Sequence, residues 1–298
     1  MEKLPKRSSK LLLISGAEPV RQRSFVGIDD RAARVLTRDD ACACYTEPMC
    51  GKASVSHLAW KDIFDWASAL TPPAHLPPDP ERRINISPSR LRRKSEPDSM
   101  VWETLPMVYA DQELDVPTEA IWPYLPYWSR GGLPYTKDGR LLSTANARLR
   151  RDGDPFAPTF MQAWNRDRRV VVFVSWFYEF DRRVHPQVPW AVFPLNQPFW
   201  AMAGLASFSR GEDGVPRPSV AIITVEPNEV LTSVGHHRSP ALLDGPGAVM
   251  TWLRGERAEA LDLLQPYAND MMGVESVPMG IKIPGNENVD LPGTLEAR

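Results

Sequence analysis

The spacing of apolar residues changes along the chain near residue 49. Residues 1–48 show neither the period of two typical of a strand nor the period of 3.6 typical of a helix. We therefore predict that residues 1–48 are an N-terminal extension, either disordered or absent from the mature protein, with Met49 as an alternative start. The rest of the chain is predicted to form one domain over residues 49–284, followed by a tail over residues 285–298.

Within this predicted domain, short apolar runs outnumber segments with helical spacing. Helices are predicted over residues 57–70, 160–167 and 256–264. Strands are predicted over residues 83–86, 100–109, 121–124, 169–176, 190–193, 199–204 and 219–224. Because strands and helices do not alternate regularly, the pattern favours an α+β fold over a doubly wound parallel sheet. We expect a single mixed domain around a curved, barrel-like, mainly antiparallel sheet with peripheral helices.

Composition narrows the class of protein. Of the 298 residues, 43% are hydrophobic and 24% are charged, which is typical of globular chains and excludes disorder throughout. No apolar stretch approaches the roughly 20 residues that cross a bilayer, so no membrane partner is expected. The net charge of −2 neither indicates nor excludes a nucleic-acid partner, because a local basic groove is enough to attract phosphate.

The cysteines favour a reducing compartment. Cys42, Cys44 and Cys50 are odd in number and clustered, which makes a poor disulfide framework. A cytoplasmic location is the simpler interpretation. With His57 they form the spacing C-x-C-x5-C-x6-H, which fits no usual zinc motif, so we expect neither a metal nor another cofactor.

Four short segments carry residues able to do chemistry. Cys50, once N-terminal, would offer an amine and a thiol that together close a thiazolidine ring on an aldehyde. Glu179 lies in Trp-Phe-Tyr-Glu-Phe, where aromatic neighbours should raise the carboxyl pKa. Asn146 lies in Asn-Ala-Arg, and at most one of His236 and His237 can face a common pocket. Taken singly, each also fits a structural cysteine, a solvent-facing carboxylate, a loop cap or a surface histidine.

In this order the segments resemble the SOS-response-associated peptidase (SRAP) family of abasic-site processing proteins. The matching stretches are Met49-Cys50-Gly51, Asn85-Ile86-Ser87-Pro88, Leu125-Pro126-Tyr127-Trp128, Asn146-Ala147-Arg148, Phe177-Tyr178-Glu179, Ala203-Gly204-Leu205, Ile223-Thr224 and His236-His237-Arg238-Ser239-Pro240. The resemblance implies a monomer of the bacterial cytosol or nucleoid that binds single-stranded DNA containing abasic sites. It also implies a covalent thiazolidine crosslink with abasic sites, abasic lyase activity and self-processing peptidase activity.

The resemblance also assigns roles to residues. Cys50 would form the crosslink, Asn146 would orient the amine and the sugar, Glu179 would carry protons, and His236 would hydrogen-bond the sugar oxygen. Arginine clusters beside tryptophans independently suit a groove that follows phosphates and stacks bases, although solvated loops account for the same clusters. The expected DNA-binding residues are Lys52, Arg82, Arg83, Pro88, Trp122, Trp128, Arg148 and Arg238.

Some positions depart from the family pattern. Pro123 and Trp176 replace glycines and Ser239 replaces a methionine, and the tryptophan is expected to narrow or re-aim the site. The largest departure is the chain before Cys50, because an amide nitrogen cannot form an imine. Translation from Met49, which we favour, cleavage of the Met49–Cys50 bond, and a relative that does not crosslink all remain open. The alternative functions are a non-catalytic single-stranded nucleic-acid binding module and a thiol self-processing peptidase without a DNA role.

Overall fold

The computed structural model describes residues 51–93, 96–211 and 213–282. The chain divides into two units, Met1–Tyr45 and Thr46–Arg298, and all the described residues belong to the second unit. The predicted extension, the predicted tail and all three cysteines lie outside the described residues, so the predicted domain limits stay predictions. Among the described helices, none combines the length and the apolar character needed to cross a membrane.

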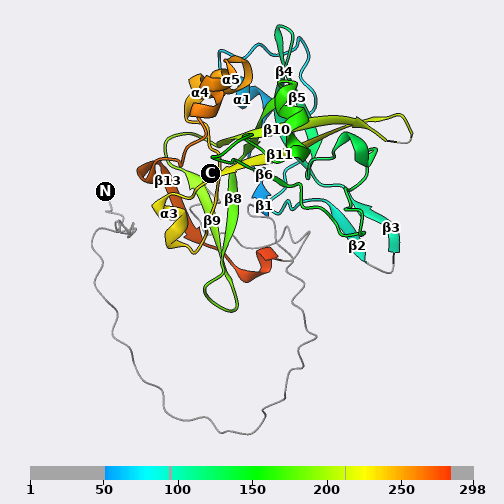
Figure 1. Cartoon of the computed structure of the whole chain (residues 1–298). Helices are drawn as coiled ribbons and strands as arrows, with labels where there is room; N and C mark the ends of the chain where they lie inside the picture. Colours follow the sequence, from blue (N-terminus) through cyan, green and yellow to red (C-terminus); the bar gives the residue numbers. More distant parts are fainter. Residues whose placement is uncertain (1–50, 94–95, 212, 283–298) are drawn as a thin grey trace, which may run out of the picture. The chain divides into compact units, whose positions relative to one another are not determined.

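Five strands form a closed, barrel-like sheet (Figure 1). They are β4 (Thr104–Asp111), β5 (Leu114–Ile121), β7 (Arg169–Val174), β10 (Trp200–Arg210) and β11 (Pro216–Val225). They pair in the order β10–β7–β4–β5–β11, and a β10–β11 pairing closes the ring. Within the ring β5 and β11 are parallel and the other pairs antiparallel. The predicted α+β fold around a barrel-like sheet is confirmed.

Two short strands extend the barrel at the end of β11. β6 (Asn146–Arg148) runs parallel to β11, and β12 (Ser239–Pro240) runs antiparallel to it. Arg148 and Pro240 both pair with Thr224 in the strand register. The Asn-Ala-Arg motif and the segment after the histidines are thereby attached to one strand end.

A second sheet has the order β1–β8–β9–β13 and is antiparallel throughout. Its strands are β1 (Lys52–Ser54), β8 (Trp176–Asp181), β9 (Val188–Pro194) and β13 (Met272–Ser276). Ser175 alone separates β7 from β8, so the chain passes from the barrel into the second sheet at this residue. β2 (Arg90–Arg93) and β3 (Glu96–Val101) form a separate hairpin at one side (Figure 1).

Short helices cover the sheets. The α-helices are α1 (Trp60–Trp66), α2 (Pro158–Asn165), α3 (Glu229–Ser233), α4 (Gly245–Arg254) and α5 (Arg257–Asp262). The 3₁₀ turns are η1 (Tyr127–Ser129), η2 (Asn269–Met271) and η3 (Met279–Lys282). α4 packs on β7 with α5 beside it (Figure 1), and its buried Trp252 donates a 2.8 Å hydrogen bond to the Val170 carbonyl.

Two buried apolar clusters lie on opposite sides of β8. Phe177 belongs to the larger cluster, and Trp176 and Tyr178 belong to the smaller one. Because side chains alternate along a strand, Glu179 points to the same side as Phe177. Trp176 therefore lies across β8 from Glu179, where its indole N–H donates to the Tyr178 hydroxyl over 2.7 Å. Trp176 therefore does not narrow the space beside Glu179, and the other expectation, that it re-aims the site, stays a prediction.

The predicted helices are confirmed as α1, α2 and α5, whereas some predicted strands have different limits. The strand expected over residues 100–109 is two strands, β3 and β4. Residues 121–124 begin where β5 ends, and the run over residues 169–176 contains β7 and the start of β8. The apolar run over residues 169–176 continues from β7 into β8, so its hydrophobic pattern does not reveal the break, whereas no strand follows β5 over residues 122–124.

Candidate functional site

A buried carboxyl–imidazole pair connects β8 to the loop after α3. Glu179 Oε2 lies 2.9 Å from His236 Nε2, and the two side chains are 3% and 1% exposed. His236 Nδ1 lies 2.8 Å from the carbonyl oxygen of Arg238, which can only accept, so Nδ1 carries a hydrogen. His236 Nε2 and Glu179 Oε2 therefore share one proton, as an imidazolium–carboxylate or an imidazole–carboxylic acid pair.

Burial and pairing together set the pKa values of this pair. Burial raises the pKa of Glu179 above its ordinary value, and the hydrogen bond with His236 offsets the rise only in part. Burial lowers the pKa of His236, but the hydrogen bond with Glu179, the charge of that carboxylate and the bond to the Arg238 carbonyl together raise it above its ordinary value. Both shifts favour retention of the shared proton, which suits a general acid–base role.

A helix-terminating turn positions His236. Asn228 caps the N-terminus of α3, and its side chain accepts a 3.0 Å hydrogen bond from the Leu231 N–H. At the other end, Gly235 N–H donates to the Thr232 carbonyl over 3.0 Å. His236 N–H donates to the Leu231 carbonyl over 2.9 Å, which completes a Schellman motif. Gly235 has a φ of +79°, the left-handed conformation that this motif requires at that position.

Replacing Gly235 with alanine is expected to lower the free energy of unfolding by about 2–4 kcal/mol. A Cβ at Gly235 would lie 2.2 Å from Asp181 Oδ1, on the strand that carries Glu179, and the positive φ adds strain. Urea unfolding would measure the loss. Gly139→Ala is the matched control, because Gly139 has a φ of +78° with nothing within 4 Å of the added carbon. Equal losses in the two variants would contradict a close approach at Gly235.

Asn146 presents a buried side-chain amide next to the barrel. It lies on β6 opposite Ile222 of β11. Its Oδ1 and Nδ2 atoms are buried and, among the described residues, have no hydrogen-bond partner. The same holds for Glu179 Oε1. Buried polar atoms are rarely left unsatisfied, so these three atoms are candidates to bind a substrate or a neighbouring residue outside the described part.

β1 begins two residues after Cys50 and is held on both edges. On one edge Lys52 is paired with Tyr178 of β8. On the other edge Ala53 and Ile86 exchange two backbone hydrogen bonds of 2.9 Å. These contacts fix the start of β1 beside the strand that carries the Glu179 carboxyl group, although Cys50 itself is not described.

Lys52 is buried rather than presented to solvent. Its Nζ donates to Asn85 Oδ1 and to Ser87 Oγ, both over 2.9 Å, and the residue is 7% exposed. Asn85 and Ser87 belong to the Asn-Ile-Ser-Pro stretch, whose half-buried Pro88 follows them. In this structure the stretch therefore positions Lys52, which has no surface from which to contact a phosphate.

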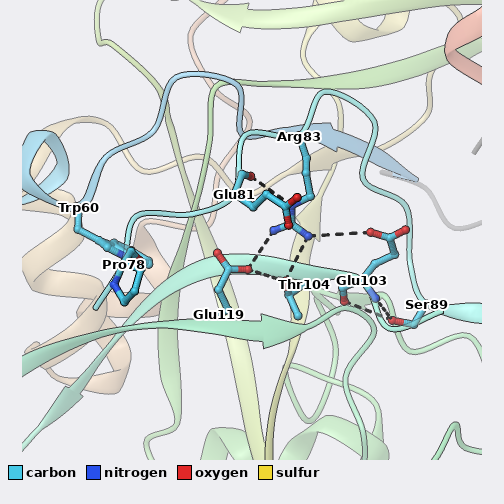
Figure 2. Close-up of polar contacts among 8 residues, drawn as sticks. All are labelled: Trp60, Pro78, Glu81, Arg83, Ser89, Glu103, Thr104 and Glu119. Atoms are coloured by element: carbon cyan, nitrogen blue, oxygen red, sulfur yellow. Dashed lines mark hydrogen bonds and ion pairs between the residues drawn. The ribbon is translucent and has the colours of Figure 1, made fainter. Parts of the chain in front are cut away.

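Arg83 is enclosed by acidic and hydroxyl side chains (Figure 2). Its Nη2 lies 3.0 Å from Glu119 Oε2, and its Nη1 lies 3.2 Å from Thr104 Oγ1 and 4.0 Å from Glu103 Oε2. The Arg83 side chain is 13% exposed, and its carbonyl accepts a 2.7 Å hydrogen bond from Val55 N–H. Arg83 thus fastens the segment beside β1 to the barrel, and its guanidinium group is already occupied by carboxylates.

Arg148 and Arg238 differ sharply in exposure. The Arg148 side chain, on β6, is 65% exposed, whereas the Arg238 side chain is 2% exposed. Arg238 donates to Glu226 Oε1 over 2.5 Å and to the Thr224 carbonyl. Arg148 Nη2 lies 3.9 Å from the same Glu226 oxygen. Of these two expected phosphate contacts, only Arg148 has its guanidinium group at the surface.

The other expected DNA-binding residues also separate by exposure. Trp122 is fully buried and donates a 2.9 Å hydrogen bond to the Ala145 carbonyl, so its ring offers no face to a base. Trp128, on η1, is 43% exposed and can stack on one. Arg82 is exposed as well, with Nη2 3.2 Å from His57 Nε2.

His237 lies at the surface beside positive charges. Its ring is 5.3 Å from the ring of His236, and His237 is exposed whereas His236 is buried. Burial, followed by the charges of His236, Arg182, Arg238 and Arg148, lowers the pKa of His237. The charges that act on His237 are therefore positive.

Three contributors to the site escape the sequence analysis. Glu226 joins the two arginines, and Gly235 shapes the histidine loop. Arg183 binds Asp181 through Nε and Nη2 over 3.0 and 2.9 Å and also donates to the carbonyl of Ser233 at the end of α3. A glycine before histidines offers a weak signal for a helix end, but single carboxylates and arginines are too common to be recognised by type.

Comparison with known proteins relates this geometry to one family. A profile described as SOS response associated peptidase (SRAP) matches residues 49–283. The abasic site processing protein HMCES of Gallus gallus is 30% identical over 126 residues, which cover 35% of this chain and 37% of that protein. The abasic site processing protein YoqW of Bacillus subtilis is 25% identical over 175 residues, which cover 57% of this chain and 73% of that protein. The chain thus spans just over a third of the first relative.

Solved structures share the fold. A protein from Bordetella bronchiseptica superimposes with a TM-score of 0.55 at 19% identity, covering 77% of this chain and all of that one. A phage-related protein from the same organism gives a TM-score of 0.50 at 20% identity, covering 77% of this chain and 95% of that one. At these identities the likeness concerns the fold alone.

Proposed function

Because the chain belongs to the SRAP family, we propose that it is an abasic-site processing protein that captures abasic sites in single-stranded DNA covalently through Cys50. It would act as a cytoplasmic monomer without a cofactor. The names of the relatives, which describe abasic site processing, support the general activity. The crosslink, the single-stranded substrate and the associated lyase and peptidase activities are part of the proposal.

The observation that carries the proposal is the buried Glu179–His236 pair at 2.9 Å on the strand next to β1. Consecutive Cα atoms are about 3.8 Å apart, so the Cα of Cys50 lies within roughly 7.6 Å of that of Lys52. Lys52 pairs with Tyr178, the residue before Glu179. This connectivity to the strand that carries Glu179 supports the proposal that Cys50 reacts beside the pair.

The proposed reaction begins with the amine of Cys50 and the aldehyde of a ring-opened abasic sugar. The amine adds to the carbonyl carbon to form a carbinolamine, which gains one proton on its hydroxyl and loses water to give an iminium, and the nitrogen then gives up one proton to leave the imine. The thiol then adds to the imine carbon, the nitrogen gains the proton that the thiol loses, and a thiazolidine ring closes. No oxidant or reductant is needed, and one water molecule is released.

Proton transfer is the part of this reaction that the structure supports best. The shared proton of Glu179 and His236 is available to the departing hydroxyl, and the pair can regain it from the amine. The unpartnered amide atoms of Asn146 are available to orient the amine and the sugar. The same imine would permit elimination of the DNA 3′ phosphate, which is the proposed lyase activity.

The chemistry requires a free amine on Cys50. Three states of the N-terminus are possible. Initiation at Met49 followed by removal of that methionine, or hydrolysis of the Met49–Cys50 bond, would free the amine, whereas retention of the preceding chain would leave it as an amide. The first two give the reactive residue, and hydrolysis by the Cys50 thiol itself would be the proposed peptidase activity. Mass spectrometry of protein made from the native gene distinguishes the three states.

Incubation with a single-stranded oligonucleotide that contains one abasic site is expected to give a slower band on a denaturing gel. The band should be absent with an undamaged oligonucleotide and with Cys50→Ala, because the crosslink needs both the aldehyde and the thiol. A serine in place of the cysteine should stop at a reversible imine, which borohydride reduction would trap. A protein whose mature chain begins before Cys50 and gives no band would refute covalent capture.

The two alternative functions give different results in the same experiment. Salt-sensitive binding without a covalent band, unchanged in Cys50→Ala, would indicate a single-stranded nucleic-acid binding module. A new N-terminus at Cys50 without any DNA binding would indicate a self-processing peptidase. N-terminal mapping and the gel together assign one outcome to each function.

A further inference from the structure

Glu226 lies between the two arginines of the Asn-Ala-Arg and His-His-Arg motifs. It directly follows β11, and its Oε1 atom lies 2.5 Å from Arg238 Nη1 and 3.9 Å from Arg148 Nη2. The carboxylate is 44% exposed, as a group at the protein surface would be. A single oxygen thus faces two guanidinium groups, which is the arrangement that a bound phosphate oxygen would have.

The two contacts of Glu226 differ in strength. Arg238 is buried, and a buried charge without its counter-charge is strongly destabilising. Its short hydrogen bond therefore holds Glu226 in place. The contact with the exposed Arg148 is long and solvated, and such contacts contribute little to stability. Glu226 is therefore anchored by Arg238, while its negative charge acts on Arg148.

We propose that Glu226 is a specificity-determining residue that competes with DNA phosphates for Arg148 and so weakens sequence-independent binding of single-stranded DNA. The inference rests on the proposed DNA-binding function. A protein that must find rare damaged sites gains from weak phosphate contacts, because binding of undamaged strands is then quickly reversed. The neighbouring positive charges of Arg151 and Arg182 remain to attract the strand.

Binding of an undamaged single-stranded oligonucleotide, followed by fluorescence anisotropy, tests the proposal. Glu226→Gln keeps an oxygen that can accept from Arg238 and removes the charge, and it should tighten binding by about three- to tenfold at low salt. Arg148→Ala alone should weaken binding only about twofold to threefold, because its charge is already partly neutralised. When Arg148→Ala is added to Glu226→Gln, the increase in DNA affinity caused by Glu226→Gln should be lost completely.

Glu113→Gln is the matched control, because it removes the same charge from an exposed position between β4 and β5 and should leave affinity unchanged. Unchanged affinity of Glu226→Gln, or a gain that persists in the Arg148→Ala background, would overturn the proposal. If Glu226→Gln unfolds, the Arg148→Ala variant still tests the proposal. A loss of DNA affinity above about tenfold in that variant would show that Glu226 does not compete for Arg148, and would overturn the proposal. Wild-type and Glu226→Gln proteins that both fail to bind would refute DNA binding itself, whereas binding by the variant alone would support the inference.

Discussion

Glu179→Gln is expected to slow crosslinking to an abasic oligonucleotide by about 10²–10⁴-fold, the usual range for loss of general acid–base catalysis. Glutamine keeps the shape of the side chain and a hydrogen-bonding oxygen, but it cannot hold the proton that Glu179 shares with His236. Binding of undamaged single-stranded DNA should stay within about twofold of the wild type, because Glu179 is buried and reaches no phosphate. Single-turnover rates from quenched gels would measure the effect.

The pH dependence gives a second readout of the same variant. In the wild type the rate should rise as the Cys50 amine, with an ordinary pKa of about 7.7–8.0, loses its proton, and fall where the pair loses the shared proton. Glu179 makes the larger contributions that raise the pKa of His236, and the bond to the Arg238 carbonyl that remains in the variant has a smaller effect than burial, which lowers the pKa. The falling limb should therefore move to lower pH in Glu179→Gln. An unchanged rate and profile would remove Glu179 from the mechanism.

Folding stability tests the pair without DNA. His236 binds its proton more tightly in the folded protein than in the unfolded one, so its stabilisation is complete below the unfolded pKa of about 6.5. That stabilisation is lost as pH rises through the higher folded pKa. In Glu179→Gln, burial lowers the pKa of His236, so stability should instead rise with pH across the same region. His57 and His237, whose pKa values are lowered in the folded protein, add the same rising slope to both proteins, so the difference between the two slopes, measured by urea unfolding between pH 5 and 8, reports the pair.

The residues that the sequence analysis identified well are those with local signals. The run of β-branched residues in 169–174 predicts a buried strand and gives β7, and the apolar spacing in 160–165 gives α2. The aromatic residues around Glu179 predict its raised pKa, because burial in an apolar neighbourhood depends on nearby sequence. The two adjacent histidines differ in burial, although their rings lie 5.3 Å apart, so which of them is buried depends on the surrounding structure and not on adjacency alone.

The remaining features depend on which segments meet in space. The basic character of Arg83, Lys52 and Arg238 suggests phosphate contacts, yet all three guanidinium or ammonium groups are enclosed by partners distant in sequence. From sequence alone, Trp122 is compatible with a stacking surface and with the core. The structure shows that it is fully buried. Sequence type assigns a residue its possible chemistry, and tertiary packing decides whether that chemistry reaches solvent.

Arg238→Met is expected to lower the free energy of unfolding by about 2–4 kcal/mol. Methionine fills a similar volume but removes the hydrogen bonds to Glu226 and to the Thr224 carbonyl that tie β12 to the end of β11. The decrease in the free energy of unfolding should be smaller than for breaking an ion pair with two buried partners. Glu226 is 44% exposed, so water can solvate its carboxylate once Arg238 is gone. Chemical denaturation would give the value.

The matched control for this prediction is Arg151→Met, at an exposed position, which should change stability by no more than about 0.5 kcal/mol. The salt dependence of DNA binding then separates structure from recognition. Replacing an Arg238 that is only structural should destabilise the fold without lowering the slope of log affinity against log salt, because Arg148, the exposed arginine, is retained. A stable Arg238→Met protein whose slope falls by about 0.7, the value for one phosphate contact on a single strand, would instead make Arg238 a DNA contact.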